Sequence, residues 1–224
     1  MKDESSIALA RLLQLASPAL PVGAYSYSQG LEAAVEAGVV GDAASAQCWI
    51  ADVLELAVVR LEASVFFRLC AAWRANDGDS AARWNALFLA SRESAELRAE
   101  TVQMGYSLLQ LTRELGLNGG LESWEEVSFP AAFAHAVVNW DIEPRDALIA
   151  YLWAWTENQV MAAVKSVPLG QTEGQRILFA LGAQLPDLAK RAASLDDDAM
   201  GNFVPGLALL SARHETQYSR LFRS

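Results

Sequence analysis

The chain has 224 residues, of which 53% are hydrophobic and 20% charged, so it is long and apolar enough to bury a sizeable core and is not a disordered chain. Its 17 basic and 27 acidic residues give a net charge of −10. This balance argues against nucleic-acid binding, because proteins that bind phosphate backbones carry basic surfaces.

No segment has the pattern of a membrane span or a secretion signal. The best apolar run, residues 147–155, is far shorter than the about 20 apolar residues that cross a bilayer. Asp3 and Glu4 stand where a signal peptide carries only basic residues. Cys48 and Cys70 fit small core residues. We therefore expect a cytoplasmic protein that does not bind membranes.

Helical patterns begin near the N-terminus. Leucines recur at helical spacing from Leu9 onward until Ser17 and Pro18, where proline stops the helix. Asp42 is placed to cap a long helical pattern over residues 43–75, which ends at residues 76–78. Because this pattern is longer than an average helix, we expect a break near Arg60.

The same spacing continues over residues 81–91 and 93–115, and residues 118–120 are the best candidate for a hinge. Ser123-x-x-Glu126 has the spacing of a capping box. Pro130 and Pro144 each suit the first turn of a helix.

No run of alternating β-branched residues predicts a strand. The sequence predicts an all-α fold, one domain over residues 1–224 built as a bundle of roughly eight to ten helices. The first few residues and the segment from Asp196 to the C-terminus are expected to be less tightly held than the rest.

The most polar turn of the chain separates two apolar helical runs, residues 147–164 and 177–181. Pro168 and Gly170 predict a sharp reversal, with a positive φ at the glycine. Thr172-x-x-Gln175 predicts a capping box for the next helix. Lys165 precedes the turn, and its ammonium is expected to reach outward. A turn this polar between apolar helices indicates a surface that a partner recognises.

Known catalytic motifs are missing from the sequence. It has no phosphate-binding Gly-x-x-x-x-Gly-Lys-Ser/Thr loop and no Gly-x-Ser-x-Gly elbow. Only His135 and His214 are histidines; neither has the spacing of a metal site, and His135 fits a lone structural or surface residue. The chain is therefore expected to be no enzyme and to hold no cofactor or metal of its own.

A helical enzyme with a buried carboxylate site remains an alternative. The carboxylates that could build such a site are Glu93 with Glu96, and Glu122 with Glu125 and Glu126. Charges on solvent-exposed helix surfaces explain them better.

Four segments occur in the order typical of one protein family. They are residues 12–32 (LLQLASPALPVGAYSYSQGLE), 91–98 (SRESAELR), 164–171 (VKSVPLGQ) and 214–224 (HETQYSRLFRS). Together they closely resemble the urease accessory protein F family over essentially the whole chain. Ala24-Tyr25 departs from the family pattern, where phenylalanine is more frequent at the second position, and this change is conservative.

The resemblance implies a non-enzymatic, dimer-forming, all-helical protein. Such a protein joins accessory protein D (H in some systems) and the GTPase accessory protein G. The complex helps to place nickel into apo-urease, with GTP hydrolysed by the GTPase subunit, so nickel passes through the complex without resting on this chain. The resemblance and the polar turn predict these partner-binding residues: Tyr27, Glu32, Arg92, Glu93, Lys165, Pro168, Gly170, Gln171, Tyr218, Arg220, Leu221 and Phe222.

Simpler interpretations of the same residues stay open. Residues 17–23 could be a rigid connector between two helices, with Tyr25 and Tyr27 as core or interface aromatics. Arg92 and Glu93 could be an ordinary surface pair, and Lys165 a helix-end cation. The tail is too apolar and too cationic for a solvated end, so we expect it to become ordered when it meets a partner. A generic helical adaptor not connected with metals is the alternative function.

Overall fold

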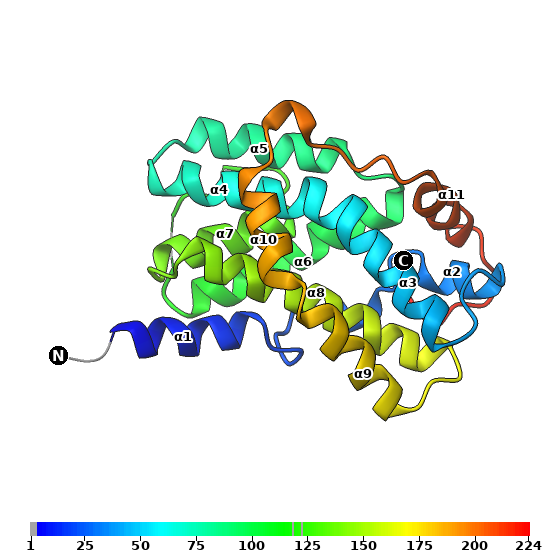
Figure 1. Cartoon of the computed structure of the whole chain (residues 1–224). Helices are drawn as coiled ribbons and strands as arrows, with labels where there is room; N and C mark the ends of the chain where they lie inside the picture. Colours follow the sequence, from blue (N-terminus) through cyan, green and yellow to red (C-terminus); the bar gives the residue numbers. More distant parts are fainter. Residues whose placement is uncertain (1–3, 118, 122) are drawn as a thin grey trace.

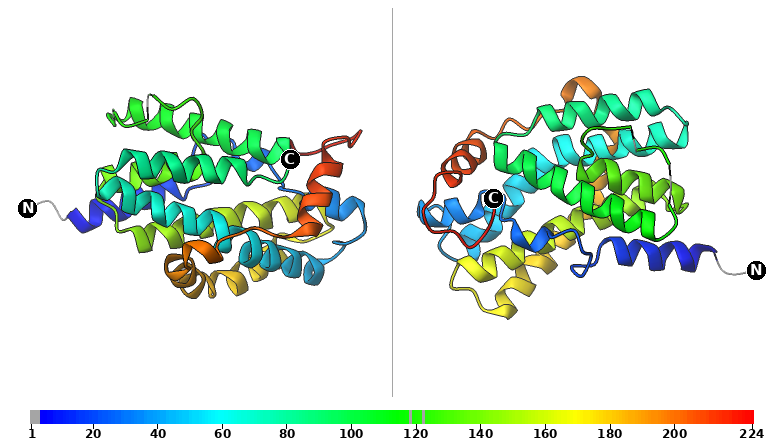
Figure 2. Two further views of the ribbon diagram at one scale, coloured as in Figure 1. Left: turned by 90° about the horizontal axis from the view of Figure 1, so that it is seen from above. Right: turned by 180° about the vertical axis from the view of Figure 1, so that it is seen from behind.

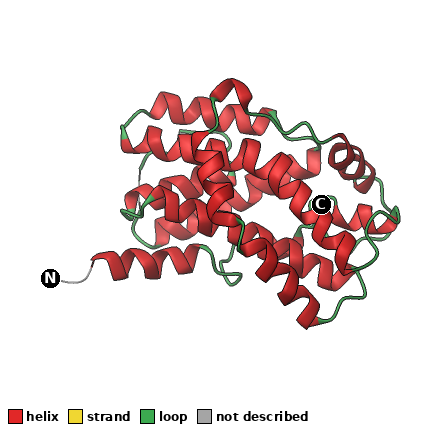
Figure 3. Cartoon of the chain, viewed as in Figure 1, coloured by secondary structure: helices red, strands yellow, loops and turns green. Residues whose placement is uncertain are grey.

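In the computed structural model, which describes residues 4–117, 119–121 and 123–224, helix follows helix and no described residue lies in a strand (Figures 1 and 3). The α-helices are α1 (Glu4–Leu15), α2 (Leu31–Glu36), α3 (Ala43–Val53), α4 (Ser64–Arg74), α5 (Gly78–Ala90), α6 (Ala95–Glu114), α7 (Phe129–Asn139), α8 (Pro144–Ser166), α9 (Gln171–Gly182), α10 (Leu185–Ser194) and α11 (Pro205–His214). Three other helical segments join them: η1 (Ala24–Ser26), η2 (Leu54–Ala63) and η3 (Asp197–Ala199).

The predicted all-α bundle is confirmed. Apart from the six-residue α2, each α-helix in the described part of the chain has ten or more residues. Their buried side chains form one hydrophobic cluster that reaches from Leu15 to Phe222. None of the helices in the described ranges is long and apolar enough to span a bilayer.

Helix α7 lies in the interior because its sequence is apolar on every side. All its residues from Pro130 to Val137 are buried, including His135. Helices α4 and α6 pack against it. On α6, Gly105 lets the chain before α7 approach closely, since a Cβ there would lie 2.1 Å from the carbonyl oxygen of Val127. This packing makes α4, α6 and α7 the centre of the bundle.

Several predicted helix boundaries are confirmed. The Asp42 carboxylate accepts a hydrogen bond from the Ser45 N–H at 2.8 Å and caps α3. Pro130 and Pro144 lie in the first turns of α7 and α8. Helix α1 ends at Leu15, just before Ser17 and Pro18.

The long pattern over residues 43–75 does not break near Arg60. Its middle part, η2, has the wider π-helical geometry, so the chain runs on from α3 into α4. At the end of η2, the Ser64 hydroxyl donates to the carbonyl oxygens of Val59 and Ala192, 3.0 Å away in each case. The widened turns place Glu62 in the interior, where it is 9% exposed.

Three turn predictions are wrong. No helix begins at Ser123; the next helix, α7, starts at Phe129. Gly170 has φ −74°, so the turn needs no left-handed residue. Helix α9 begins at Gln171 and not after Thr172, because the Glu173 carboxylate accepts from the Gly170 N–H at 3.2 Å and closes the first turn.

Some predictions fall on residues outside the described ranges. They are the expectation that the first few residues are less tightly held, as far as it concerns residues 1–3, the hinge as far as it includes position 118, and the carboxylate set as far as it includes Glu122.

Candidate functional site

The C-terminal segment, residues 215–224, folds back onto the start of α2 and the side of α6. The right-hand view of Figure 2 shows it in red, leaving α11 and returning beside α2. Phe222 and Ser224 are 6% and 1% exposed. The expectation that the C-terminal segment is loosely held is therefore wrong, because its last residues are buried against apolar and polar groups of the core.

Glu32 on α2 anchors the backbone of this segment. Its carboxylate is 7% exposed and accepts hydrogen bonds from the N–H of Leu221 at 2.7 Å and of Phe222 at 3.0 Å. The same carboxylate lies 3.2 Å from Nε2 of His214. A single buried acid thus joins α2, the end of α11 and the C-terminal segment.

The second ring nitrogen of His214 contacts an acid of α6. Nδ1 of the imidazole lies 2.6 Å from the Glu96 carboxylate, which also accepts from Nη1 of Arg220 at 2.6 Å. His214 is fully buried. Each ring nitrogen therefore faces a carboxylate, and the imidazole joins the acids of α2 and α6.

Ser224, the last described residue, forms hydrogen bonds with Ser28 and Gln29. Its carbonyl oxygen accepts from the Ser28 N–H at 2.7 Å, the Ser28 hydroxyl at 2.6 Å and the Gln29 N–H at 3.1 Å. The Ser224 hydroxyl donates to the Glu100 carboxylate at 2.7 Å. Gln29 adopts φ +52°, a left-handed conformation that is uncommon for glutamine. These bonds hold the segment at both its backbone and its last side chain.

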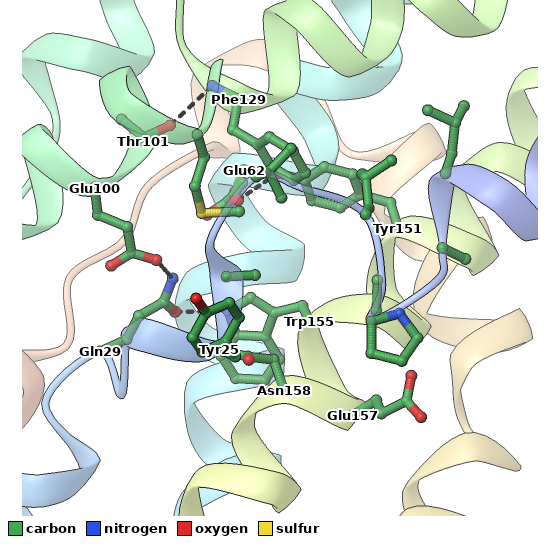
Figure 4. A pocket seen from close by; sticks show the side chains of 18 of the residues that line it. Tyr25, Gln29, Glu62, Glu100, Thr101, Phe129, Tyr151, Trp155, Glu157 and Asn158 are labelled. Carbon is green, nitrogen blue, oxygen red and sulfur yellow. Dashed lines mark hydrogen bonds between the residues drawn. The ribbon is translucent and has the colours of Figure 1, made fainter. Parts of the chain in front are cut away.

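A cavity of about 240 Å³ lies beside this docked segment, between the chain after α1, helix α6 and helix α8 (Figure 4). Its walls are mostly apolar, with Leu15, Leu20, Phe88 and Met104 among them. A mostly apolar hollow with a few converging polar groups is the usual form of a binding site.

Gln29 links the cavity to the C-terminal segment. Its amide nitrogen donates to Glu100 at 2.6 Å, and its amide oxygen accepts from the Trp155 indole N–H at 2.6 Å (Figure 4). Burial raises the pKa of Glu100 to about 7, against the hydrogen bonds of Gln29 and Ser224, which lower it. Glu100 therefore changes charge near neutral pH at the contact between cavity and segment.

A second buried acid, Glu62 of η2, also lines the cavity. It accepts a hydrogen bond from the Tyr151 hydroxyl and lies 3.5 Å from the Arg92 guanidinium. Burial raises the pKa of Glu62, although Arg92 and Tyr151 act in the opposite direction. The pKa of Tyr151 is also raised by burial and by Glu62.

Arg92 and Glu93 are not a surface pair. Their side chains are 10% and 8% exposed, and Glu93 accepts from the Asn202 amide at 2.7 Å. Glu96 is only 18% exposed. The interpretation of these acids as exposed helix charges is wrong, because η2, α6 and the chain before α11 enclose them. Arg92 and Glu93 thus offer little surface for direct contact with a partner.

Lys165 stands at the cavity's mouth near the end of α8. Its Nζ lies 5.6 Å from the ring centroid of Phe222 and 6.0 Å from that of Tyr25. Lys165 and Tyr25 both line the cavity. Lys165 is exposed, as expected for a lysine that reaches outward, and its ammonium lies over two aromatic rings.

The structure thus brings together Tyr27, Glu32, Lys165 and Phe222. Tyr27 is buried, and its carbonyl oxygen accepts from the Asn158 amide at 3.1 Å. Tyr218, Arg220 and Leu221 lie on the exposed side of the C-terminal segment. Pro168, Gly170 and Gln171 form the exposed turn between α8 and α9.

Sequence reasoning did not assign several residues of this site, namely Ser28, Gln29, Glu100, His214 and Ser224, and it named Glu96 only for the alternative carboxylate site. Burial of Glu100 inside α6 was readable in principle, because it follows Leu97 at helical spacing and precedes Met104. The pairing of His214 with two acids had no local signal, since its partners lie more than 100 positions away.

Among the residues that the structure describes, no three His, Cys, Asp or Glu side chains are grouped so as to hold a metal ion. The buried carboxylates of the site are hydrogen-bonded to protein donors.

Comparison with known proteins gives a consistent result. A sequence model of the UreF family matches residues 40–182. The chain is 57% identical over 223 residues to a urease accessory protein UreF of Azoarcus sp. (strain BH72), covering 96% of this chain and 95% of that protein. It is 54% identical over 227 residues to the protein of the same name from Dechloromonas aromatica (strain RCB), covering 99% and 100%. A third such protein, from Methylobacillus flagellatus, is 50% identical over 224 residues, covering 98% of this chain and 99% of that protein.

Proposed function

Because the chain belongs to the UreF family of urease accessory proteins, we propose that it supports urease maturation by bridging two other accessory proteins. One is accessory protein D, called H in some systems, and the other is the GTPase accessory protein G. In this proposal the assembly delivers nickel to apo-urease while the GTPase hydrolyses GTP. The chain contributes surfaces and carries out no catalytic step.

The docked C-terminal segment is the observation that supports this proposal most. Its backbone is fixed by Glu32, while Tyr218 and Leu221 are 105% and 71% exposed. Arg220 and Arg223 are exposed beside them, in a chain whose net charge is −10. Aromatic and arginine side chains held rigidly at a surface are typical centres of protein interfaces. We assign this face to a protein partner.

The exposed turn of Pro168, Gly170 and Gln171 supports a second contact. It follows directly on α8, whose Lys165 reaches the C-terminal segment through Phe222. One partner bound to the C-terminal segment and another bound to the turn between α8 and α9 would therefore both lie next to the C-terminal end of α8. This arrangement suits a protein that binds two others together.

Homodimer formation is part of the proposal. Helix α1 packs against α8, yet Leu9 and Leu13 on α1 are 57% and 64% exposed. Burial of these exposed leucines against a second copy of the chain would remove apolar surface from water and so favour a dimer. Light scattering of the purified chain, alone and with accessory protein D, tests this part.

Co-purification tests the bridge. We expect the full chain to retain accessory protein D alone, and to retain the GTPase accessory protein when D is also present. A cell that makes urease and the other accessory proteins but not this chain should contain urease with little nickel, and expression of the chain should restore it. Urease that is fully loaded with nickel in the absence of the chain would contradict the proposal and leave a generic helical adaptor as the alternative.

A further inference from the structure

Lys165 lines the cavity and has its ammonium close to two aromatic rings. Its Nζ lies within 6.0 Å of two ring centroids, those of Tyr25 and Phe222, a distance at which an ammonium is attracted to the face of an aromatic ring. In the part of the chain that the structure describes, Lys165 forms no ion pair. The two rings are thus the contacts that define where its charge lies.

The two rings come from segments far apart in the sequence. Tyr25 belongs to η1 and is 66% exposed, whereas Phe222 belongs to the C-terminal segment and is 6% exposed. Lys165 is carried by the last turn of α8. We call Tyr25, Lys165 and Phe222 the aromatic clamp, because the lysine joins η1 and the C-terminal segment to the end of α8.

Phe222 decides which residues of the segment face outward. Phe222 and Ser224 are buried, while Leu221 and Arg223 between and beside them are exposed. Because buried and exposed residues alternate over residues 221–224, a slip of the chain by one residue would exchange the two sets. Glu32 fixes the backbone of Leu221 and Phe222, and the clamp fixes the Phe222 side chain.

From these contacts we infer that Lys165 is a positioning residue for the C-terminal segment. It holds Phe222 in its buried site and thereby keeps Tyr218, Arg220 and Leu221 on the outer face. The consequence for partner binding rests on the proposed function, whereas the clamp is a property of the isolated chain and can be measured there.

A simple helix-end role makes a different prediction. A lysine in the last turn of α8 also interacts favourably with the helix dipole, and loss of this interaction would weaken the whole fold without selecting the C-terminal segment. The two roles are separated by measuring local opening of the segment against global unfolding.

Hydrogen exchange of the purified full chain provides this measurement. The reporters are the amides of Leu221 and Phe222, which donate to Glu32, and of Arg223, which donates to the Ser26 carbonyl oxygen. Lys165→Met keeps the length of the side chain and removes its charge. We expect it to speed exchange at these amides by roughly two- to thirtyfold, the range that corresponds to the usual strength of a cation–π contact.

Two controls accompany this variant. Lys165→Arg keeps a cation that interacts with aromatic rings, so exchange should stay close to that of the unchanged protein. Lys190→Met removes the same charge from an exposed position on α10 and should have no effect on the segment. Amides of the buried helix α7 should keep their protection in all three variants.

Unchanged exchange at the three reporter amides in Lys165→Met would overturn the inference, and so would an equal rise in α7. Failure of Lys165→Arg to restore slow exchange would also overturn it. If Lys165→Met does not fold, Phe222→Leu removes the ring from the other side and should loosen the same amides. Binding of each variant to accessory protein D is measured in parallel. If Lys165→Met loses binding while exchange in the segment stays slow, the aromatic clamp is refuted but the proposed function is not. If exchange becomes faster while binding stays normal, the proposed role of the segment in partner binding is refuted.

Discussion

Glu32 and His214 are 182 positions apart in the sequence, and their side chains meet 3.2 Å apart in the interior. This contact joins the first quarter of the chain to its end. The Glu32 carboxylate also accepts from two N–H groups of the C-terminal segment, so one acid determines where that segment lies.

Glu32→Gln should therefore destabilise the protein and release the C-terminal segment. The substitution removes the charge that strengthens three hydrogen bonds, and we expect a loss of about 1.5–3 kcal/mol in the free energy of unfolding. Urea denaturation gives the value. Glu36→Gln on the same helix changes an exposed acid and should have an effect within about 0.5 kcal/mol. Equal effects of the two variants would contradict this assignment.

Truncation after Ala212 should lower the melting temperature by at least about 5 °C. The sequence alone predicts little change, because the tail has no evident core to join. The structure reverses this expectation, since truncation deletes the buried His214, Phe222 and Ser224. Calorimetry of the truncated chain decides between them, and an unchanged melt would show that these buried contacts contribute nothing.

Glu100→Gln should stabilise the protein above neutral pH. The folded-state pKa of Glu100 is raised from 4.5 to about 7. Below pH 4.5 the carboxyl group is protonated in both states. As pH rises from 4.5 through 7, the unfolded chain releases this proton first, so the stability that Glu100 contributes is progressively lost.

The variant has no proton to release. At pH 8 it should be more stable than the unchanged protein by up to about 3 kcal/mol, and the difference should shrink at pH 5.5. Urea denaturation at the two pH values measures it. A difference that does not depend on pH would mean that burial does not raise the pKa of Glu100.

The isolated chain should neither hydrolyse GTP nor bind nickel tightly. The sequence has no phosphate-binding loop, and the described residues include no group of side chains arranged around a metal site. A GTPase assay and nickel titration calorimetry test both parts. A stoichiometric nickel site of sub-micromolar affinity on the purified chain would contradict the prediction.

Local signals in the sequence predict the helices well. Asp42, Pro130 and Pro144 act through their own backbone neighbourhood, and each marks a helix boundary in the structure. The turns around Gly170 and Ser123 were mispredicted because Glu173 and Ser128 offer competing helix starts within a few residues. Such competition is decided by packing and not by the turn residues alone.

The site was only partly predictable. Resemblance to a family located Glu32, Lys165 and Phe222 but not what they contact. Arg92 and Glu93 follow a helix end at a position that normally faces water. They are buried because η2 and the chain before α11 meet them there. Contacts between α2, α6 and the C-terminal segment depend on the topology of the whole chain, so no local sequence pattern predicts them.

The central claim is that the exposed face of the C-terminal segment binds accessory protein D. A matched pair of tyrosine variants tests this claim most directly. Tyr218→Ala and Tyr106→Ala each remove an exposed ring, one from the segment and one from α6, and neither should change the melt. The measurement is the dissociation constant for accessory protein D. We predict that Tyr218→Ala weakens binding by at least about tenfold, the loss expected at an interface centre, while Tyr106→Ala binds normally. Normal binding of the folded Tyr218→Ala protein would contradict the account.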